Sequence, residues 1–350
     1  MRTTIIDVAR RAGTSTATVS HVLNSVGRMG KETRRRVLAA VKELKYYPNF
    51  HARSLARHRS RTMGIIVSDI ENPFFPTVIR AFEREAQKHG YDVMVSDTEY
   101  RPALTHRAAE RMMEMKVIGV AIMTSEMSAA LIDEILSQNI LVTFFDYGMV
   151  GERTSNLNLD YMSGTREAID HLYNFGHRRI AFVGGRSSLP NVKARQVAYV
   201  ACMLEKGLEP GPIVIGNQLV DGGVAAGEAL LQMAPRPTAV MAMNDLTAIG
   251  VMSAFRQHGL RTPNDVSVVG FDHTYLSRFY QPPLTTVDMQ PAYLGRLAAK
   301  SLLELASASA PKGRDYPVPL HLVVSESTGP APPEVPIARE ALAQAKDRNP

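Results

Sequence analysis

Five apolar runs in the sequence end in a carboxylate or an amide side chain, a pattern typical of a small-molecule binding site. The runs are GIIVSD (64–69), YDVMVSD (91–97), ILVTFFD (140–146), TAVMAMND (238–245) and VSVVGFD (266–272). Ligands of open α/β sheets bind outside the carboxyl ends of the strands. We therefore expect the polar residues at these ends to face a common ligand: Asp69, Asn72, Asp97, Asp146, Asn244, Asp245 and Asp272.

Aromatic residues accompany the same run ends, namely Phe74, Phe75, Tyr147, Phe271 and Tyr275. Carboxylates and amides beside aromatic faces suit a polyhydroxylated or heterocyclic small molecule. A single Asp in such a place is more commonly a loop cap or a helix N-cap, so the prediction depends on several ends converging. The chain contains no Trp, so any aromatic surface that stacks on the ligand must be Phe or Tyr.

Motifs of common enzyme mechanisms are absent from the sequence. No G-x-G-x-x-G follows the first strand-like run, and no G-x-x-x-x-G-K-[ST], H-E-x-x-H or G-x-S-x-G occurs. The single cysteine, Cys202, excludes an internal disulfide framework and a cysteine-based zinc site. We therefore expect a protein that is not an enzyme and that has no cofactor and no metal site.

Strand-like and helical runs alternate from Met63 to about residue 326, and this alternation is what would position the binding residues. Two further strand-like runs are VIGVAIM (117–123) and RIAFVGG (179–185). Strict alternation indicates parallel sheets covered by helices on both faces. Seven strand-like runs are too many for one small sheet, and their spacing shifts near residues 155–165. The sequence thus predicts two doubly wound subdomains with a cleft between them.

The N-terminal stretch Thr4 to Asn24 predicts two short helices joined by a tight turn, a helix-turn-helix. Gly13 follows the apolar face of the first helix, where it can end that helix, and Thr14 and Ser15 can cap the second. A third helix is expected from about Lys31. Small or polar residues lie off the apolar face of the second helix and could enter a DNA groove: Thr16, Ala17, Ser20, His21 and Asn24.

The segment from Asn49 to Arg61 is basic and has one large aliphatic residue, Leu55. Such a short segment is marginal as an isolated helix and could be ordered by DNA. A plain linker is the simpler interpretation. The functional alternative is a hinge helix whose Leu55 inserts between base pairs from the minor groove.

The charge of the chain is divided unevenly. Residues 1–61 hold fourteen of the 40 Lys and Arg and three of the 34 Asp and Glu, so their formal charge is +11 and the rest of the chain carries −5. A strongly basic N-terminal part is typical of a protein that binds nucleic-acid phosphates.

The sequence resembles the lactose-repressor (LacI/GalR) family of bacterial transcription regulators. The resemblance covers the chain to about residue 328 and is strongest in TIIDVARRAGTSTATVSHVLN (4–24) and KETRRRVLAAVKELKYYPNFHARSL (31–55). It continues in IENPFF (70–75), GHRRIAFVGG (176–185), RPTAVMAMNDLTAIG (236–250), VSVVGFD (266–272) and PPLTTVDMQP (282–291).

The resemblance implies a homodimer that binds palindromic double-stranded operator DNA, with one recognition helix in each half-site. By position, Thr16, Ala17 and His21 would contact bases in the major groove, and Ser20 and Asn24 would lie nearer the phosphates. Leu55 matches the family's intercalating leucine within the ARSL motif, and Ala52 would lie beside it in the groove.

The resemblance also implies an effector pocket formed by Asn72, Phe74, Asp146, Arg195, Asn244 and Asp272. Arg195 opens an R-x-x-A-aromatic pattern that ends at Tyr199. Its planar guanidinium suits ligand hydroxyls or a carboxylate. The segment SSLPNVKAR (187–195) matches no particular ligand subgroup, so the identity of the effector stays open.

The expected fold class is therefore α/β, with a three-helix head and a periplasmic-binding-protein-like body of two doubly wound subdomains. The expected parts are a helix-turn-helix domain (1–47), a hinge (48–61), an effector-binding and dimerisation domain (62–328) and a flexible tail (329–350). Within the body, an N-subdomain would comprise about 62–160 and 290–318, and a C-subdomain about 161–289 and 319–328.

Residues and resemblance together predict a ligand-responsive DNA-binding regulator, foremost a repressor of sugar-utilisation genes. The alternative is a regulator of the same family under corepressor-type control by a purine or another non-sugar metabolite. A transporter's solute-binding protein would need an export signal and no DNA-binding head, and the sequence has the opposite features. Since the N-terminus lacks the apolar core of a signal peptide and no run could span a bilayer, we expect a cytoplasmic protein with no membrane partner.

Overall fold

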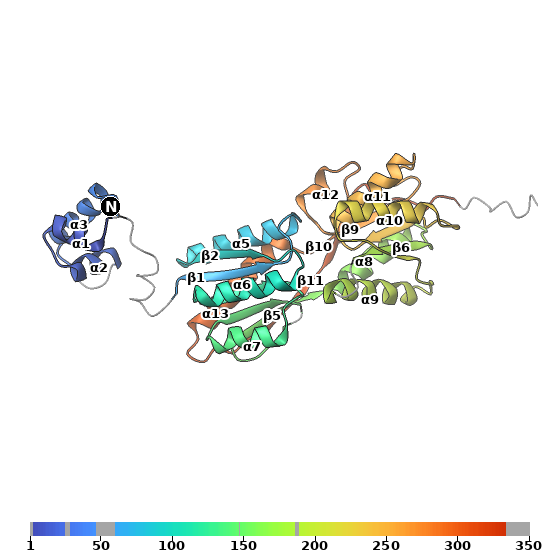
Figure 1. Ribbon diagram of the computed structural model, residues 1–350. Coiled ribbons are helices and arrows are strands. Elements are labelled where there is room, and N and C mark those ends of the chain that lie inside the picture. The colour runs from blue at the N-terminus through green and yellow to red at the C-terminus, as the bar shows by residue number, and fades with distance from the viewer. Residues whose placement is uncertain (1–2, 25–28, 47–59, 147, 186–188, 334–350) are drawn as a thin grey trace, which may run out of the picture. The chain divides into compact units, whose positions relative to one another are not determined.

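The computed structural model describes residues 3–24, 29–46, 60–146, 148–185 and 189–333. The chain separates into a helical unit, Met1–Ser60, and an α/β unit, Arg61–Pro350 (Figure 1). Several residues of the sequence predictions lie outside the described residues: Ala52, Leu55, Tyr147, the tail beyond residue 333 and the side chain of Asn24.

Within its described residues, the helical unit consists of α1 (Ile5–Ala12), α2 (Thr16–Asn24) and α3 (Lys31–Glu43). Helix α1 begins at a capping box between Thr4 and Asp7 and ends at Gly13, whose φ of 62° lies in the left-handed region that favours glycine. Helix α2 follows Ser15, whose hydroxyl accepts a hydrogen bond from the Thr18 N–H at 3.1 Å. These are the stop and start signals that the sequence predicted, and the helix-turn-helix is confirmed.

All three helices contribute to one small apolar core. Its buried members are Val8, Ala9, Ala12, Val19, Val22, Val37 and Ala40. Helix α3 begins at Gly30, which offers no side-chain hydrogen bond to the helix N-terminus. Because glycine at this place costs only a few tenths of a kcal/mol relative to a capping side chain, packing can hold this helix without a cap.

The first sheet of the α/β unit has six parallel strands in the order β11-β5-β4-β3-β1-β2. The strands are β1 (Thr62–Val67), β2 (Asp92–Asp97), β3 (Gly119–Met123), β4 (Leu141–Phe145), β5 (Thr154–Asp160) and β11 (Asp315–Pro319). The helices beside them are α5 (Phe74–Lys88), α6 (Pro102–Glu114), α7 (Ala129–Ser137) and α13 (Pro291–Ser307).

The second sheet has the order β12-β10-β9-β8-β6-β7. Its strands are β6 (Ile180–Gly184), β7 (Ile213–Ile215), β8 (Ala239–Ala242), β9 (Ser267–Asp272), β10 (Thr285–Asp288) and β12 (His321–Val323). Its helices are α8 (Tyr161–Asn174), α9 (Pro190–Glu205), α10 (Val220–Leu231), α11 (Asp245–Gln257) and the short α12 (Tyr275–Phe279). Strand β12 is antiparallel to β10, whereas the other pairs are parallel.

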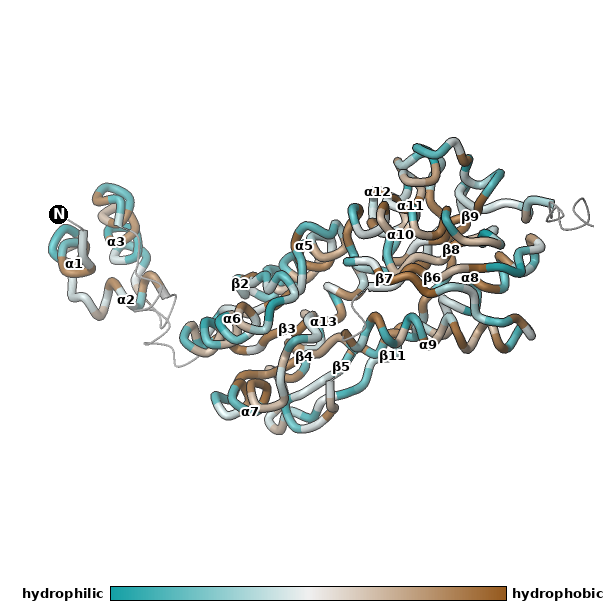
Figure 2. The backbone as a smooth tube through the Cα atoms, turned by 45° about the vertical axis from the view of Figure 1, so that its right-hand side comes forward, coloured by the Kyte–Doolittle hydropathy of each residue, from teal (hydrophilic) through white to brown (hydrophobic). Residues whose placement is uncertain are grey.

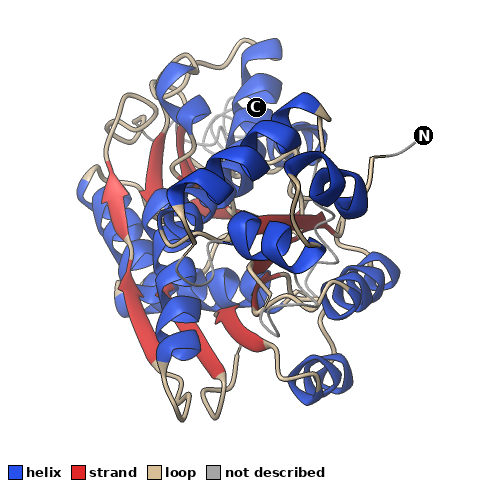
Figure 3. Ribbon diagram, turned by 90° about the vertical axis from the view of Figure 1, so that its left-hand side faces the viewer, coloured by secondary structure: helices blue, strands red, loops and turns tan. Residues whose placement is uncertain are grey.

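Helices cover both faces of each sheet, as the strand–helix alternation predicted (Figure 3). In β1, Ile65 packs in the same apolar cluster as α5 and α13, whereas its neighbour Ile66 packs with α6 and α7. In β6, Phe182 packs with α8 and α9, whereas Val183 packs with α10 and α11. Because successive side chains of a strand point to opposite faces, such strands must be apolar throughout, and the tube of Figure 2 shows β6 and β8 as strongly apolar stretches.

The chain passes between the two sheets three times in its described part: from β5 to α8, from β10 to α13 and from β11 to β12. In each sheet the strand order doubles back beside the first strand, between β1 and β3 and between β6 and β8. This doubly wound order opens a crevice at the carboxyl ends of the strands, and the predicted fold class is confirmed. Every helix among the described residues is too short or too polar to span a bilayer.

Among the described residues, five strands were not predicted from the sequence, because they are short or carry polar residues at buried positions: β5, β7, β10, β11 and β12. Strand β5 (TSNLNLD) is an example. Its Asn156 is buried because the side-chain amide donates to Asp315 Oδ1 at 2.9 Å and accepts from the Gly148 N–H at 3.2 Å. Hydrogen bonds of this kind replace the apolar alternation by which a strand is recognised.

Helices α10 and α11 pack closely where Gly223 of α10 lies against Gly250 of α11. A Cβ atom on Gly250 would lie 2.1 Å from the Val220 carbonyl oxygen, so an alanine there must push backbone away. We expect Gly250→Ala to lower the free energy of unfolding by about 1–3 kcal/mol, as overpacking does, although alanine favours helix. Urea unfolding followed by circular dichroism measures this. Ala225→Ser, at an exposed position of α10, should change it by less than about 0.5 kcal/mol, and equal losses would contradict the prediction.

Candidate functional site

The second helix of the helical unit presents a polar surface. Thr16, Ala17 and His21 are exposed, and Ser20 is half-buried, whereas Val19 and Val22 on the opposite face are buried. The exposed side chains are small or can donate and accept hydrogen bonds, which are the properties needed to contact base edges in a major groove. Their role in DNA recognition remains a prediction.

Exposed basic residues surround this helix-turn-helix. On α3 they are Arg34, Arg35, Arg36 and Lys42. Arg35 is paired with Glu32 at 2.8 Å, and Arg11 of α1 is paired with Glu43 at 2.8 Å. Exposed pairs of this kind contribute little stability, so the arginines can exchange these partners for phosphates at small cost.

In the α/β unit, the carboxyl ends of strands from both sheets line one cavity of about 60 Å³. The first sheet and its loops contribute Ser68, Asn72, Phe74, Phe75, Tyr100, Met123, Thr124, Ser125, Phe145, Asp146 and Leu159. The second sheet and its helices contribute Tyr161, Asn191, Arg195, Gln218, Met243, Asn244, Asp272 and Met289. The six predicted effector residues are therefore brought together, and binding by them remains a prediction.

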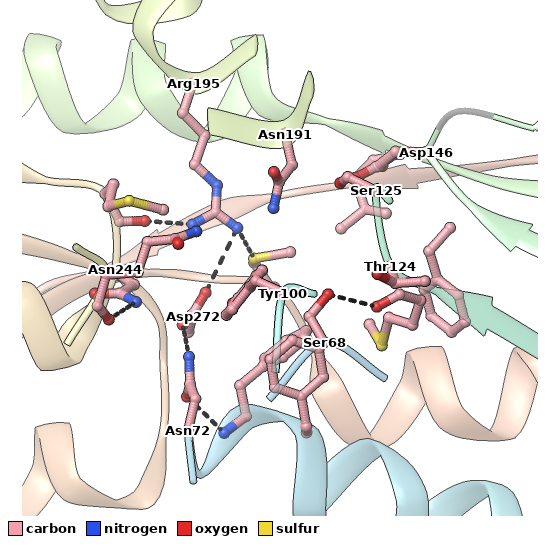
Figure 4. Close-up of a pocket in the computed structure, with 18 of the residues that line it drawn as sticks. Ser68, Asn72, Tyr100, Thr124, Ser125, Asp146, Asn191, Arg195, Asn244 and Asp272 are labelled. Carbon is pink, nitrogen blue, oxygen red and sulfur yellow. Dashed lines mark hydrogen bonds and ion pairs between the residues drawn. The ribbon is translucent and has the colours of Figure 1, made fainter. Parts of the chain in front are cut away.

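Arg195 and Asp272 form the charged centre of the cavity (Figure 4). Arg195 Nη2 lies 3.6 Å from Asp272 Oδ1, and Nη1 donates to the Met243 carbonyl oxygen. The guanidinium carbon lies 4.4 Å from the ring centre of Phe271. Arg195 Nε is buried and has no hydrogen-bond partner among the described residues.

Asn72 joins the two halves of the cavity. Its Nδ2 donates to Asp272 Oδ2 at 3.3 Å, and its Oδ1 accepts from the Phe74 N–H at 3.0 Å. Asn72 follows a strand of the first sheet and Asp272 ends a strand of the second, so this bond crosses the cleft (Figure 4). Burial raises the pKa of Asp272 to about 7, an effect that Arg195 opposes.

Asp146 has a similar position at the end of β4. Its φ of 73° turns the chain sharply there, and the carboxylate accepts hydrogen bonds from the Tyr161 hydroxyl and from the Leu159 N–H at 3.1 Å. Burial raises the pKa of Asp146 to about 6, although these hydrogen bonds and Arg195 lower it.

Asn244 is largely occupied by protein partners. Its Oδ1 accepts from the Thr247 N–H at 2.8 Å and caps α11, and its Nδ2 donates to the Gln218 carbonyl oxygen at 2.8 Å. Phe74 meets Phe75 edge to face, with ring centres 5.3 Å apart. Asn244 and Phe74 therefore help to shape the wall of the cavity.

Five of the described residues that the sequence placed at strand ends do not line the cavity, namely Asp69, Asp97, Asp245, Phe271 and Tyr275. The side chains of Asp69 and Asp97 accept hydrogen bonds from the N–H groups of Glu71 and Glu99, as local turn caps do. Asp245 is fully buried, Phe271 is buried with its ring against the Arg195 guanidinium, and Tyr275 is 61% exposed. Capping was the simpler interpretation of such residues, and it holds for Asp69 and Asp97.

Several lining residues were not predicted as site residues from the sequence, among them Ser68, Tyr100, Thr124, Ser125, Asn191 and Gln218. Ser68 and Thr124 follow strands directly, so the strand-end rule could have found them. Tyr100 has no such signal. It enters the cavity from a turn in which Glu99 and Tyr100 both have left-handed backbone, with φ of 49° and 51°, which sequence patterns do not mark for these residue types.

Comparisons with known proteins cover both units. The profile described as "Bacterial regulatory proteins, lacI family" matches residues 4–49, and the profile described as "Periplasmic binding protein-like domain" matches residues 169–328. The chain is 32% identical over 327 residues to the HTH-type transcriptional repressor PurR of Mannheimia succiniciproducens, a match that covers 93% of this chain and 98% of that repressor.

A second relative and a solved structure are also similar to this chain over most of its length. The repressor of the same name from Haemophilus influenzae is 34% identical over 304 residues, which are 86% of this chain and 90% of that one. The crystal structure of the Lac repressor dimer bound to operator and the anti-inducer ONPF superposes with a TM-score of 0.82 at 28% identity, covering 94% of this chain and 100% of that chain. All of these proteins are repressors.

The buried carboxyl group of Asp146 generates a second prediction. Its pKa of about 6 in the folded chain lies above the unfolded value of about 3.9. Its contribution to stability is therefore fully present below about pH 4 and is lost as the pH rises through about 6. The asparagine of Asp146→Asn cannot ionise. The variant should therefore not lose the roughly 3 kcal/mol of unfolding free energy that the wild type loses between about pH 4 and pH 7.

Urea unfolding of wild type and variant at several pH values in that range measures the difference. Asp133→Asn, at an exposed position of α7, should keep the pH dependence of the wild type. A wild-type pH profile in Asp146→Asn would show that burial of this carboxyl group does not govern the dependence.

Proposed function

The chain belongs to the lacI family of bacterial regulatory proteins and is a DNA-binding transcriptional repressor, and we propose that a neutral, purine-like metabolite bound in the cleft controls it. The sequence alone favoured a sugar effector. The relatives carry the name PurR, which favours the purine alternative. The comparisons also confirm that the protein is not an enzyme.

The charge of the cavity is the observation that carries the proposal. Among the described residues that line it, the charged ones are two carboxylates, Asp146 and Asp272, and one cation, Arg195, which already pairs with Asp272. An anionic ligand, such as a nucleotide or a sugar phosphate, would find no free cation among these described residues, and burying an uncompensated charge is costly. A neutral ligand with N–H donors can instead hydrogen-bond to the carboxylates.

The remaining wall suits a flat, nitrogen-rich ligand. Phe74, Phe75, Tyr100, Phe145 and Tyr161 supply aromatic surface, which stacks on planar heterocycles. The side-chain amides of Asn191 and Gln218 also line the cavity, and an amide can both donate and accept, whereas those of Asn72 and Asn244 already bind protein partners. A purine base offers N–H donors and ring-nitrogen acceptors in one plane and so matches both features.

The mechanism that we propose is closure of the cleft by the effector. A cavity of about 60 Å³ holds only a few water molecules, so a purine can enter only if the subdomains move apart or side chains rearrange. An effector that binds the closed arrangement more tightly than the open one shifts the population toward closure. As a corepressor, it would thereby favour the arrangement that binds the operator.

For DNA, we propose a homodimer on a palindromic operator. Thr16, Ala17 and His21 of each protomer would contact bases, with Ser20 and Asn24 nearer the phosphates. Residues 48–61 would act as the hinge, in which Leu55 wedges into the minor groove beside Ala52. The exposed polar face of α2 and the basic N-terminal part of the chain support this proposal.

A ligand screen tests the effector class. Adenine, guanine, hypoxanthine and their nucleosides should raise the melting temperature of the full chain, since a ligand that binds only the folded state stabilises it by mass action. The matching nucleotides and a panel of neutral sugars should not. The purine that stabilises most should also strengthen operator binding in a gel-shift titration.

Asp272→Asn serves as the variant in this screen and should bind that purine about tenfold or more weakly, because a hydrogen bond to a charged group is lost. Stabilisation by a sugar but by no purine would restore the sugar hypothesis. Stabilisation by nucleotides as strong as that by bases would refute the charge argument.

The DNA proposal predicts a separation of specific from nonspecific binding. His21→Ala should weaken binding to the operator by about 1–3 kcal/mol, as the loss of a base contact does, and should change binding to random DNA little. Fluorescence anisotropy with both DNAs at one fixed salt concentration measures this. His106→Ala, at an exposed histidine of the α/β unit, is the control; parallel losses on both DNAs for His21→Ala would indicate a phosphate contact instead.

A further inference from the structure

We propose that Asp245, which does not line the cavity, is a positioning residue that holds Asp272 in place to bridge the two subdomains. The inference rests on the proposed function only in so far as Asp272 also contacts the effector. The turn that follows β9 has an unusual backbone. Asp272 has a φ of 106° and His273 a φ of 55°. Two successive residues other than glycine in this region are strained, and such a turn persists only where its surroundings hold it.

The carboxylate of Asp245 supplies that hold. Its Oδ2 accepts hydrogen bonds from the Thr274 N–H at 2.6 Å and from the Thr274 hydroxyl at 2.9 Å. Its Oδ1 accepts from the Thr286 hydroxyl at 2.5 Å. Asp245 is the first residue of α11, Thr274 follows the strained turn and Thr286 lies in β10. One fully buried side chain thus ties three elements together around the turn.

Strand β9 packs closely against the carboxylate of Asp245. Gly270 of β9 lies directly against it, and a Cβ atom at Gly270 would come within 2.5 Å of Asp245 Oδ1. The strand therefore makes room for the carboxylate by lacking a side chain there. A charged group this deeply buried is costly unless its hydrogen bonds are satisfied, and three donors satisfy it.

The hold on the turn fixes where the Asp272 carboxylate points. From this backbone, Asp272 reaches Arg195 at 3.6 Å within its own subdomain and Asn72 at 3.3 Å on the other. Asn72 in turn caps the start of α5 through the Phe74 N–H. If the turn relaxes, Asp272 leaves both partners, and the contact across the cleft is lost together with the ordered carboxylate.

The test uses near-isosteric variants, because Asp245→Ala would leave three buried donors unpaired and could unfold the chain. Thr274→Val and Thr286→Val each remove one hydroxyl donor to Asp245. Thr247→Val is the matched control. Thr247 is also buried and lies on the same helix, but its hydroxyl has no hydrogen-bond partner among the described residues.

The first readout needs no ligand. In a full chain carrying Cys202→Ser, spin labels at Glu83→Cys on α5 and Glu228→Cys on α10 report the distance between subdomains by double electron–electron resonance; both positions are exposed. Thr274→Val and Thr286→Val should lengthen or broaden the distance distribution, and Thr247→Val should leave it unchanged. A merely stabilising role of the hydroxyls would lower the urea midpoint without moving this distance. Distributions that match the control for both variants would overturn the inference.

The second readout separates this inference from the proposed function. With hypoxanthine as the probe, Thr274→Val and Thr286→Val should weaken binding about tenfold and Thr247→Val by less than about twofold, as measured by calorimetry. If the wild type binds no purine but the distances respond, the proposed effector class fails and the positioning role of Asp245 stands. If hypoxanthine binds all variants equally and the distances do not respond, the positioning role fails and the effector class stands.

Discussion

A buried guanidinium constrains everything around it, and in this protein that group is Arg195. It cannot lose its charge and cannot stay buried without acceptors, so Asp272, the Met243 carbonyl oxygen and the ring of Phe271 must surround it. Asp272 can do so only from a strained turn, and the turn depends on Asp245. Asp272 in turn accepts a hydrogen bond from Asn72 on the opposite subdomain. Asp272 therefore belongs both to the contact across the cleft and to the proposed effector site, so an effector that contacts it can influence how the subdomains close.

The helical unit and the α/β unit differ in the chemistry of their functional surfaces. The helical unit has a small apolar core and exposed cations, and in the proposed function its affinity for DNA depends on that charge and on a few side chains of α2. The α/β unit has extensive cores and a polar cavity whose described lining includes two carboxylates and one cation. A neutral effector changes the charge of neither unit. In the proposed mechanism, regulation therefore passes through geometry rather than through electrostatic attraction or repulsion.

Much of the fold could be predicted because its signals are local. Apolar runs gave seven of the strands, and Gly13 and Ser15 marked the turn of the helix-turn-helix. The six predicted effector residues, which the structure brings together in one cavity, were proposed from strand ends and family motifs. What could not be predicted depends on distant contacts. Strand β5 is polar because Asn156 pairs with Asp315, which is far along the chain. Tyr100 reaches the cavity through an unusual backbone, and nothing near Asp245 in the sequence shows that it faces Thr274 and Thr286 rather than the ligand.

Because the chain passes between the two sheets three times in its described part, neither subdomain is one continuous segment, and this limits how truncations and chimeras can be designed. Each subdomain is assembled from separate stretches of sequence, because β11 and α13 complete the first sheet only after most of the second has been made. No single truncation or crossover point can remove or exchange one subdomain cleanly. During synthesis, the edge strand β11 reaches the first sheet only after β6 to β10 of the second sheet have been made. Chimeras between relatives would have to exchange matched segments on both sides of the passages, whereas the helical unit, which is continuous in sequence, can be exchanged at one junction.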